Sequence, residues 1–373
     1  MATQLGLLKS FPRVLLAATF VAIGAGAPAQ ALDLTAAQLR QACETQAGHV
    51  VVLNESTKIV NGSATIASPC RIVIGAGLEL EAVSLTFSGP LTLESTVKAE
   101  VKMVRTLLSA SAISVSLTGL NSGFQTVETS LQARTGSLVM EVGAEANLLM
   151  IERLLPGPTY ALSAATSVEI RGGRKFTGLL SEVAVLAPNG FAVSFTGADS
   201  LLKVEEVGVL STRGSVQIDG SGGKGLISLD KVNFLMAGSL GVRLAGDESG
   251  LSLKEVTAGP PTGVTAAGAV VIEAGTGASR LGKMEAVEVR MFDVASITLR
   301  SSFGGAQGGL KVEKSHFSAN GDIRFETGSQ GSTEVKESTG GTETARLRAA
   351  TGAGGQCLAS QNQFFAAVME LCL

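Results

Sequence analysis

The stretch Val204-Glu205-Glu206-Val207-Gly208-Val209 decides the fold, because a similar one, Leu229-Asp230-Lys231-Val232-Asn233-Phe234, begins 25 residues later. Each has an aliphatic residue, two charged residues and then apolar residues at alternate positions. Alternation of this kind, rich in β-branched residues, is typical of short strands. When such a pattern recurs at a spacing of 20 to 50 residues, it predicts a solenoid, a propeller or an array.

The pattern can be followed eleven times along the chain. Its leading residues are separated by 21 to 31 residues and are Leu80, Val101, Val127, Ile151, Leu180, Val204, Leu229, Leu253, Met284, Val312 and Val335. A turn built only of short strands buries its apolar side by stacking on the next turn, with each strand in parallel pairing with its counterpart. At about 4.8 Å per turn, eleven turns predict a stack roughly 50 Å long.

Other repeat architectures fit the sequence less well. Leucine-rich repeats need a ladder of Asn or Cys, and the calcium-binding nonapeptide needs a Gly-rich motif; neither pattern occurs. No ten-residue segment within the repeats has a 3.6-residue apolar period with caps, which argues against helical repeats. The predicted fold class is therefore all-β, a parallel β-helix of about eleven coils with a short N-terminal capping helix.

The first 31 residues have the pattern of an export signal. Lys9 and Arg13 precede an apolar stretch over 14–27, and Ala29-Gln30-Ala31 is a small-x-small cleavage site, so the mature chain is expected to begin at Leu32. The apolar stretch is shorter than the ~20 residues that span a bilayer. We therefore expect no transmembrane segment after signal removal, and a secreted, periplasmic or cell-surface location.

The four cysteines lie in two groups, one near each end of the predicted mature chain. Four cysteines allow three pairings. We prefer Cys43 with Cys70 and Cys357 with Cys372, because each of these pairs brackets a predicted terminal cap. The predicted organisation is a signal peptide over 1–31, an N-terminal cap with the first strands over 32–75, parallel β-helix coils over 76–345, and a C-terminal cap over 346–373.

Two observations support the caps. Thr35-Ala36-Ala37-Gln38 is a capping box, and Leu39, Ala42 and Cys43 would share one face of the helix that follows it. At the other end, an apolar stretch between the last two cysteines contains Phe364, Phe365, Val368, Met369 and Leu371.

Composition excludes several function classes. Asp and Glu number 32 against 29 Lys and Arg, so the chain lacks the basic character of a nucleic-acid-binding domain. It contains two histidines and no Cys-x-x-Cys motif, which argues against a metal or redox centre. The prediction is no nucleic-acid partner, no metal and no cofactor.

The order of a short helix, Gly48-His49-Val50-Val51-Val52-Leu53 and then coils of about 24 residues resembles the right-handed parallel β-helix of the pectin-lyase-like superfamily. The resemblance covers roughly residues 35–364. It implies a fold shared by enzymes and non-enzymes, the enzymes being lyases or hydrolases of acidic polysaccharides. The hydrolase signatures Asn-Thr-Asp, Asp-Asp and Gly-His-Gly do not occur here, so no catalytic residue is carried over.

The second residue of each repeat is expected to form an outward-facing column. Its members would be Glu81, Lys102, Glu128, Glu152, Ser181, Glu205, Asp230, Lys254, Glu285, Glu313 and Lys336. Glu205 with Asp230, and Glu182 with Glu206 beside them, would lie about 4.8 Å apart, close to the ~5–5.5 Å between the carboxyl groups of retaining glycosidases. Lys231 and Lys254 are adjacent, and the chain has no Trp and a single Tyr to form a sugar platform. A solvated ladder of mixed charge is therefore preferred.

A second candidate is the basic cluster Arg171-Gly172-Gly173-Arg174-Lys175, which would suit an acidic polymer or be an ordinary charged turn. Scarce Asp, few aromatic residues and mixed surface charge favour an exported, non-catalytic rod with a structural, adhesive or surface-binding role. Its expected partner is a polysaccharide or another cell-surface component. The alternative is a polysaccharide lyase or hydrolase with a divergent active site.

Overall fold

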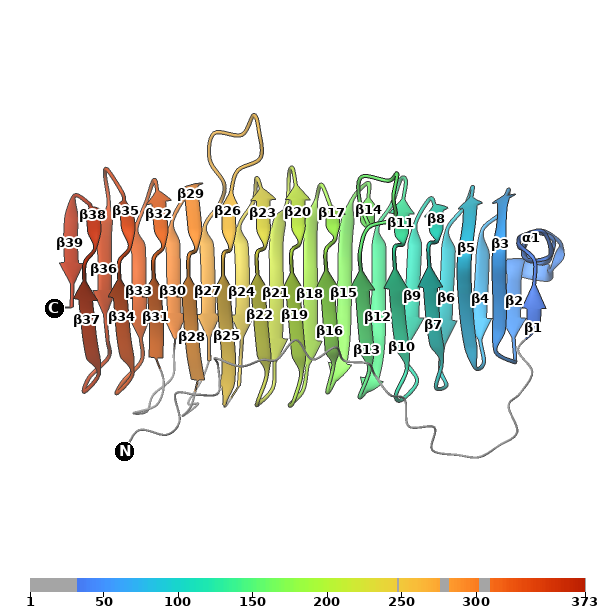
Figure 1. Ribbon diagram of the computed structural model, residues 1–373, viewed down its shortest axis with the longest axis horizontal. Helices are drawn as coiled ribbons and strands as arrows, with labels where there is room; N and C mark the ends of the chain where they lie inside the picture. The colour runs from blue at the N-terminus through green and yellow to red at the C-terminus, as the bar shows by residue number, and fades with distance from the viewer. Residues whose placement is uncertain (1–31, 247, 276–281, 302–308, 373) are drawn as a thin grey trace. The chain divides into compact units, whose positions relative to one another are not determined.

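Residues 32–246, 248–275, 282–301 and 309–372 are described by the computed structural model. They form a parallel β-solenoid in which the chain winds through two sheets, one of 14 strands and one of 25 (Figure 1). The predicted signal peptide lies outside the described residues. All strand pairings within these two sheets are parallel, which confirms the predicted fold class, while its handedness stays a prediction.

The 14-stranded sheet receives one strand from each turn. Its strands are β2 (Val50–Leu53), β4 (Cys70–Ile74), β6 (Leu91–Ser95), β9 (Ile113–Leu117), β12 (Leu138–Glu145), β15 (Ser167–Arg174), β18 (Gly190–Thr196), β21 (Ser215–Ser221), β24 (Leu240–Leu244), β27 (Val270–Ala274), β30 (Ile297–Ser301), β33 (Ile323–Thr327), β36 (Arg346–Ala350) and β39 (Val368–Leu371).

The 25-stranded sheet receives two strands from most turns. The first of each turn are β1 (Leu32–Leu34), β3 (Thr57–Ile66), β5 (Gly77–Phe87), β7 (Glu100–Val104), β10 (Gly123–Val127), β13 (Leu148–Glu152), β16 (Thr177–Ser181), β19 (Leu201–Glu205), β22 (Leu226–Asp230), β25 (Ser249–Lys254), β28 (Gly282–Val287), β31 (Gly309–Glu313), β34 (Ser332–Lys336) and β37 (Gln356–Ser360). The second are β8 (Leu107–Ala110), β11 (Ser130–Ala133), β14 (Leu162–Ala164), β17 (Ala184–Leu186), β20 (Gly208–Ser211), β23 (Asn233–Met236), β26 (Thr257–Gly259), β29 (Arg290–Val294), β32 (His316–Ala319), β35 (Thr339–Gly341) and β38 (Gln363–Phe365).

The core lies between the two sheets. Val204 pairs in register with Leu229, and Leu229 with Leu253, so these three residues stack as predicted. All three are at most 2% exposed. Because every second residue of each strand points inward, the stacked turns share one continuous apolar core.

Polar side chains inside the core satisfy backbone groups of the neighbouring turn. The backbone N–H of Val289 donates to Ser315 Oγ, that of Ser315 to Ser338 Oγ, and that of Ser338 to Asn362 Oδ1. The amide group of Asn362 also donates to the carbonyl of Val335. Buried polar groups are tolerated when they are paired in this way.

The sequence-based count of eleven coils was too low, since the 14-stranded sheet shows about fourteen turns. The predicted N-terminal segment 32–75 and C-terminal segment 346–373 both contain strands of the same two sheets, from β1 to β4 and from β36 to β39. The extra turns lie in these segments, where capping features and apolar side chains hide the repeat pattern.

Three leading positions were also assigned in the wrong register. Met103, Thr126 and Ala286 stack in the core column, where the sequence analysis placed Val101, Val127 and Met284. Val101 and Met284 still point inward, two residues earlier, but Val127 points outward beside the buried Thr126. Assigning a strand one residue out of register exchanges its inward and outward faces. This happened at Thr126 because its hydroxyl group suggested a surface position.

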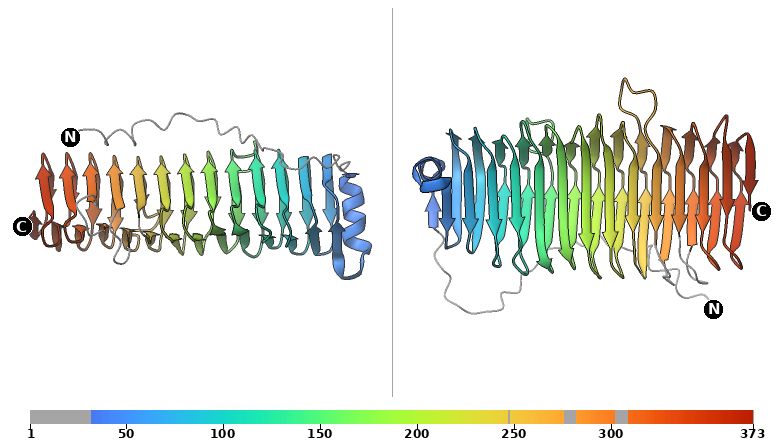
Figure 2. Two further views of the ribbon diagram at one scale, coloured as in Figure 1. Left: turned by 90° about the horizontal axis from the view of Figure 1, so that it is seen from below. Right: turned by 180° about the vertical axis from the view of Figure 1, so that it is seen from behind.

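Helix α1 (Ala36–Thr45) covers the first turn, followed by the 3₁₀ helix η1 (Ala47–His49) (Figure 2). Its predicted capping box is present: Thr35 Oγ1 accepts from the backbone N–H of Gln38, and Gln38 Oε1 accepts from that of Thr35. Leu39 and Cys43 are buried against β2, β3 and β4. The helix therefore closes the N-terminal edge of the stack, which an open β-sheet would leave exposed.

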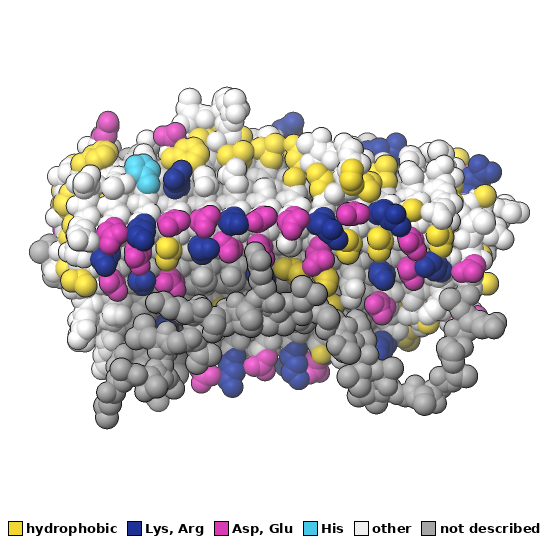
Figure 3. Space-filling view, viewed as in Figure 1, with side chains coloured by type: hydrophobic (Ala, Val, Ile, Leu, Met, Phe, Trp, Pro, Cys, Tyr) yellow, Lys and Arg dark blue, Asp and Glu magenta, His cyan; other side chains and the backbone are white. Residues whose placement is uncertain are grey.

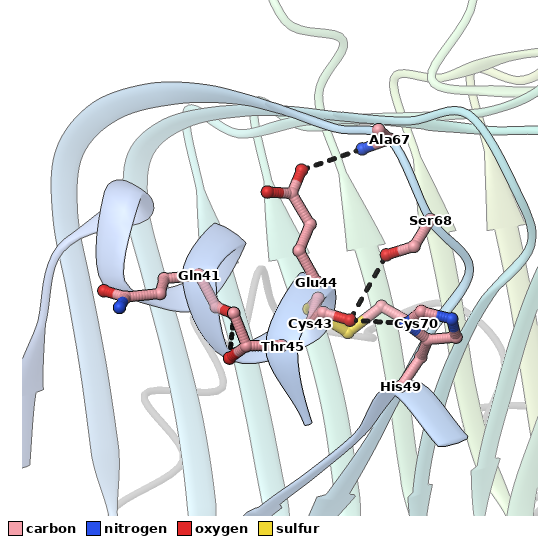
Figure 4. The surroundings of a disulfide bond; sticks show 8 residues. All are labelled: Gln41, Cys43, Glu44, Thr45, His49, Ala67, Ser68 and Cys70. Carbon is pink, nitrogen blue, oxygen red and sulfur yellow. Dashed lines mark hydrogen bonds between the residues drawn. A yellow bond between two sulfur atoms is a disulfide. The ribbon is translucent and has the colours of Figure 1, made fainter. Parts of the chain in front are cut away.

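The four cysteines lie in the two predicted pairs. The sulfur atoms of Cys43 and Cys70 are 2.06 Å apart and link α1 to β4 (Figure 4). The carbonyl of Cys43 accepts from Nδ1 of His49 and from Ser68 Oγ, so His49 has a structural contact. Cys357 and Cys372 are joined at the other end, with sulfurs 2.09 Å apart.

Candidate functional site

A column of left-handed residues runs along the 25-stranded sheet, at the bend between its two strands in each turn. Its thirteen members have φ between 47° and 57° and are Asn61, Ala82, Arg105, Glu128, Arg153, Glu182, Glu206, Lys231, Glu255, Glu288, Lys314, Glu337 and Gln361. None is glycine, although this conformation is unfavourable for residues with a Cβ atom.

Backbone hydrogen bonds between turns hold this conformation. The N–H of Glu182 donates to the carbonyl of Glu205, and the N–H of Glu206 donates to the carbonyl of Asp230, each at 3.0 Å. The N–H of Lys231 continues the series to Lys254 at 2.9 Å. The ladder thus passes through the bend without a break, and the following residue, such as the buried Val232, turns back into the core.

The side chains of the column point outward and are mostly charged. Together with the residue that precedes each member they form a stripe of alternating and mixed charge, which we call the charged stripe; a row of Lys, Arg, Asp and Glu crosses the middle of the face in Figure 3. Ion pairs link neighbouring turns, as in Arg105 with Glu81 at 3.1 Å and Arg153 with Glu128 at 3.5 Å. The stripe holds eleven acidic and six basic side chains, so these ion pairs neutralise only part of its negative charge.

The predicted carboxylate pairs lie within this stripe. Glu205 and Asp230 are in-register neighbours, as expected. Glu182 and Glu206 each follow one residue of the in-register pair Ser181 and Glu205. Each of the first two contacts a lysine: Glu205 pairs with Lys203, and Asp230 with Lys254 at 3.7 Å.

The lowered pKa of Glu206 argues against a role for this residue as a general acid. Its carboxylate accepts a hydrogen bond from Lys231 at 2.7 Å, which lowers the pKa of Glu206 below its ordinary value. A general acid that works near neutral pH needs a raised pKa. Glu206 is therefore poorly suited to act as a general acid.

Three predicted members of the outward column lie elsewhere. Lys102 and Glu285 occupy another outward column of the same sheet, where Lys102 is in register with Glu79 and Glu285 with Lys311. Glu128 belongs to the left-handed column. All three errors follow from the register shifts described above.

A second ladder on the 14-stranded sheet was missed by the sequence analysis. Five consecutive turns place Asp219, Arg243, Glu273, Arg300 and Glu326 in register, with alternating sign. Glu273 lies 3.5 Å from Arg243 and 3.4 Å from Arg300, and Arg300 lies 3.1 Å from Glu326. Aligning Ile218 with Val242, which occupy the same core column, would have revealed the series.

The first residue of this ladder differs from the others. Burial raises the pKa of the Asp219 carboxyl, and the positive charge of Arg243 opposes that rise. Asp219 is the single described carboxyl group for which a raised pKa is resolved. Its in-register neighbours on the open sheet face are Ser194 and Arg243, neither of which is a second carboxyl group.

The basic cluster 171–175 is partly neutralised. Arg171 pairs with Glu169 at 2.6 Å, and Lys175 pairs with Glu145 at 3.1 Å. These contacts leave little excess positive charge for an acidic polymer. The second histidine, His316, lies beside Thr339 with its Nδ1 2.9 Å from Oγ1, on the exposed surface.

Two shallow hollows lie on the surface of the described residues. One of about 380 Å³ lies on the 14-stranded sheet between Glu169, Asn189, Phe191 and Gln217. Another of about 380 Å³ lies where the loop at Pro156 and Pro158 approaches Arg105. Within the described residues, no three His, Cys, Asp or Glu side chains are grouped as metal ligands.

The described helices are all too short or too polar to cross a bilayer. Comparison with known proteins finds no matching family model, and no significant match among curated proteins or solved structures. The resemblance to the pectin-lyase-like superfamily therefore stays a prediction. The geometry by itself assigns the chain to the parallel β-solenoids.

Proposed function

We propose that this chain is an exported, non-catalytic β-solenoid that serves as a structural, adhesive or surface-binding rod. The observation that carries the proposal is that the candidate acids of the outward columns are each paired with a lysine. Glu205, Asp230 and Glu206, the best acid candidates in the sequence, each contact a lysine. Side chains committed to each other in this way stabilise a surface and leave no poised acid and base.

The interior suits a mechanical role. About fourteen turns at about 4.8 Å each give a stack roughly 60 Å long, held by parallel ladders and one apolar core. The covered N-terminal edge limits pairing with other sheets at that end. A stiff spacer of this kind holds apart whatever is attached to its faces or ends.

An activity assay tests the proposal. The purified full chain, incubated with pectate and with alginate in the presence of calcium, should release neither unsaturated nor reducing sugar ends above a buffer control. Sugar release that is lost in the double variant Glu205→Gln, Asp230→Asn would overturn the proposal and establish the alternative, an enzyme acting on acidic polysaccharides.

A binding assay addresses the partner. The same polysaccharides, immobilised, should retain the chain through its outward columns if the surface-binding role is correct. Replacement of Arg171 and Lys175 by Gln should weaken this retention if the basic cluster contributes to it, and the exposed neutral pair Asn233→Ala, Asn320→Ala serves as the control.

A further inference from the structure

The C-terminal end of the stack differs from the N-terminal end. Within the described residues, β37, β38 and β39 each pair on one side only, with β34, β35 and β36. Their outer edges present unpaired backbone N–H and C=O groups. Natural proteins usually blunt such edges with charges, prolines, bulges or a covering segment.

Apolar side chains concentrate at this end. Met369 continues the core column of Leu347, yet it is 44% exposed where Leu347 is fully buried. Leu358, Phe365 and Val368 widen the apolar surface, at 55%, 56% and 46% exposed. Four of the eight large hydrophobic side chains that are exposed in the described chain thus lie in this last turn.

The same turn carries almost no charge. Glu370 is the sole charged residue between 356 and 372. Its carboxylate lies 3.8 Å from both Arg346 and Arg348 of the preceding turn, so it is already neutralised. The side chains of the last turn itself thus offer apolar contact and almost no charge, and a neutral apolar surface of the same kind would fit them.

The shape of the C-terminal end of the stack narrows the choice of partner further. An occupant must present strand edges from two sheets with an apolar layer between them, which is what the end of another such solenoid offers. The N-terminal end of a second copy is closed by α1, with Leu39 and Cys43 buried beneath it. The matching open surface is the C-terminal end.

We propose that two copies of this chain dock tail to tail through β37, β38 and β39. A two-fold axis at right angles to the stack brings the two last turns together with their strands antiparallel, and antiparallel pairing is a regular ladder geometry. The contact is isologous, so it closes at two copies and does not propagate. The two Met369 side chains then complete the apolar layer that Leu347 begins.

The available area suits a reversible dimer. Ten residues from Gln356 to Phe365 span roughly 30 Å, and two sheets about 10 Å apart, with their outward side chains, make the end face roughly 20 Å wide. Such a face buries on the order of 600 Å² per copy, somewhat below the ~800 Å² of a standard interface. The bridge between Cys357 and Cys372 joins β37 to the residue that follows β39, which reduces the ordering needed on docking.

Sedimentation velocity of the full, oxidised chain over a hundredfold range of concentration tests the proposal. The expected result is a monomer–dimer equilibrium with no larger species. Val368→Glu places two like charges in the interface from an outward-facing position, and it should shift the midpoint of dimerisation to at least tenfold higher concentration. Met369→Glu should act in the same direction, with circular dichroism checking that both variants are folded.

Leu120→Glu is the matched control, since Leu120 is 56% exposed but lies in the turn between β9 and β10, far along the chain from the last turn. It should dimerise like the unchanged protein. A monomer at every concentration, an open-ended series of oligomers, or a dimer that Leu120→Glu disrupts while folded Val368→Glu does not, would each overturn the proposal.

Discussion

At the scale of single residues, the left-handed bend is the least expected feature of this chain. Thirteen residues other than glycine adopt positive φ at equivalent positions, and most are Glu, Lys or Arg. Long unbranched side chains leave the Cβ region less crowded than β-branched ones, and from Arg105 to Glu337 each bend is held by a hydrogen bond to the next turn. Ladder pairing thus compensates for local strain.

Substitution of Glu182 tests this account, since Glu182 forms no ion pair within the described residues. Glu182→Asn should leave stability nearly unchanged, because Asn tolerates the left-handed region. Glu182→Val should lower the free energy of unfolding by about 1 kcal/mol relative to Glu182→Asn. Chemical denaturation of the two variants measures the difference, and equal midpoints would contradict it.

Val232, the residue that follows the left-handed Lys231, is fully buried. Val232→Asp should lower the free energy of unfolding by about 4 kcal/mol, because an unpaired carboxylate would enter the core. The exposed neighbour provides the control: Asn233→Asp adds the same charge and should stay within about 0.5 kcal/mol. Thermal melts that do not separate the two variants would show that position 232 is not in the core.

At the scale of elements, the two sheets arrange their outward charges in ladders because parallel in-register pairing places equivalent positions of successive turns side by side. Opposite charges on neighbouring rungs attract, and like charges repel. Arg243, Glu273 and Arg300 form such a series, and Glu273 is shared by both arginines.

Glu273→Gln should therefore destabilise the chain by about 1 kcal/mol in low salt, because it removes the carboxylate from both pairs. The effect should shrink in about 1 M salt, where the screening length falls to about 3 Å. Glu100→Gln, at an exposed position without an ion pair among the described residues, is the control. A loss that does not depend on salt would point to packing as its cause.

The lysine and arginine side chains that pair with carboxylates also predict that the free energy of unfolding falls at acidic pH. The pKa values of Glu81, Glu206, Glu313 and Asp322 are lowered, in each case chiefly by a hydrogen bond from a Lys or Arg side chain. A carboxyl whose pKa is lower when folded contributes stability that is complete above its unfolded pKa, about 4, and is lost as the pH falls through the folded value.

Denaturation midpoints between neutral pH and about pH 3 should accordingly decline on acidification. In Lys231→Gln, Glu206 loses the partner that lowers its pKa. This variant should be less stable than the unchanged chain at neutral pH, with the difference vanishing toward low pH. A difference that stays constant across this range would refute the assignment.

At the scale of the whole stack, each turn contacts only its neighbours, so the two ends decide how the molecule meets other sheets. The N-terminal end is covered by α1, which Cys43 and Cys70 attach to β4. The C-terminal end is open among the described residues and carries the apolar surface proposed as a dimer contact.

Removal of the first disulfide should therefore change assembly as well as stability. Cys43→Ser, Cys70→Ser should lower the free energy of unfolding by about 3.5 kcal/mol on the chain-entropy model. Release of α1 would expose a second edge and produce species larger than the dimer, measured by sedimentation. Cys357→Ser, Cys372→Ser, which leaves α1 attached, should not produce them. An N-terminal variant with unchanged size and stability would show that α1 does not act as a cap.

The amino-acid sequence by itself determined the solenoid, its parallel stacking and both cysteine pairings. A repeat of about two dozen residues with alternating apolar positions has few other ways to bury them. Val204, Leu229 and Leu253 could be aligned because each is followed by two charged residues and then by a valine. Where the marker was weak, as at Thr126 and Ala286, the assigned register was wrong.

Only the tertiary structure decided which charges meet and which edges stay open. Glu273 is 30 residues from Arg243 and 27 from Arg300, and their contact depends on loop lengths that vary from turn to turn. The exposure of Met369 likewise depends on the absence of a following turn among the described residues, although its sequence resembles that of a buried strand. Local pattern specifies the face on which a residue lies, whereas its neighbours across the stack are set by the winding of the whole chain.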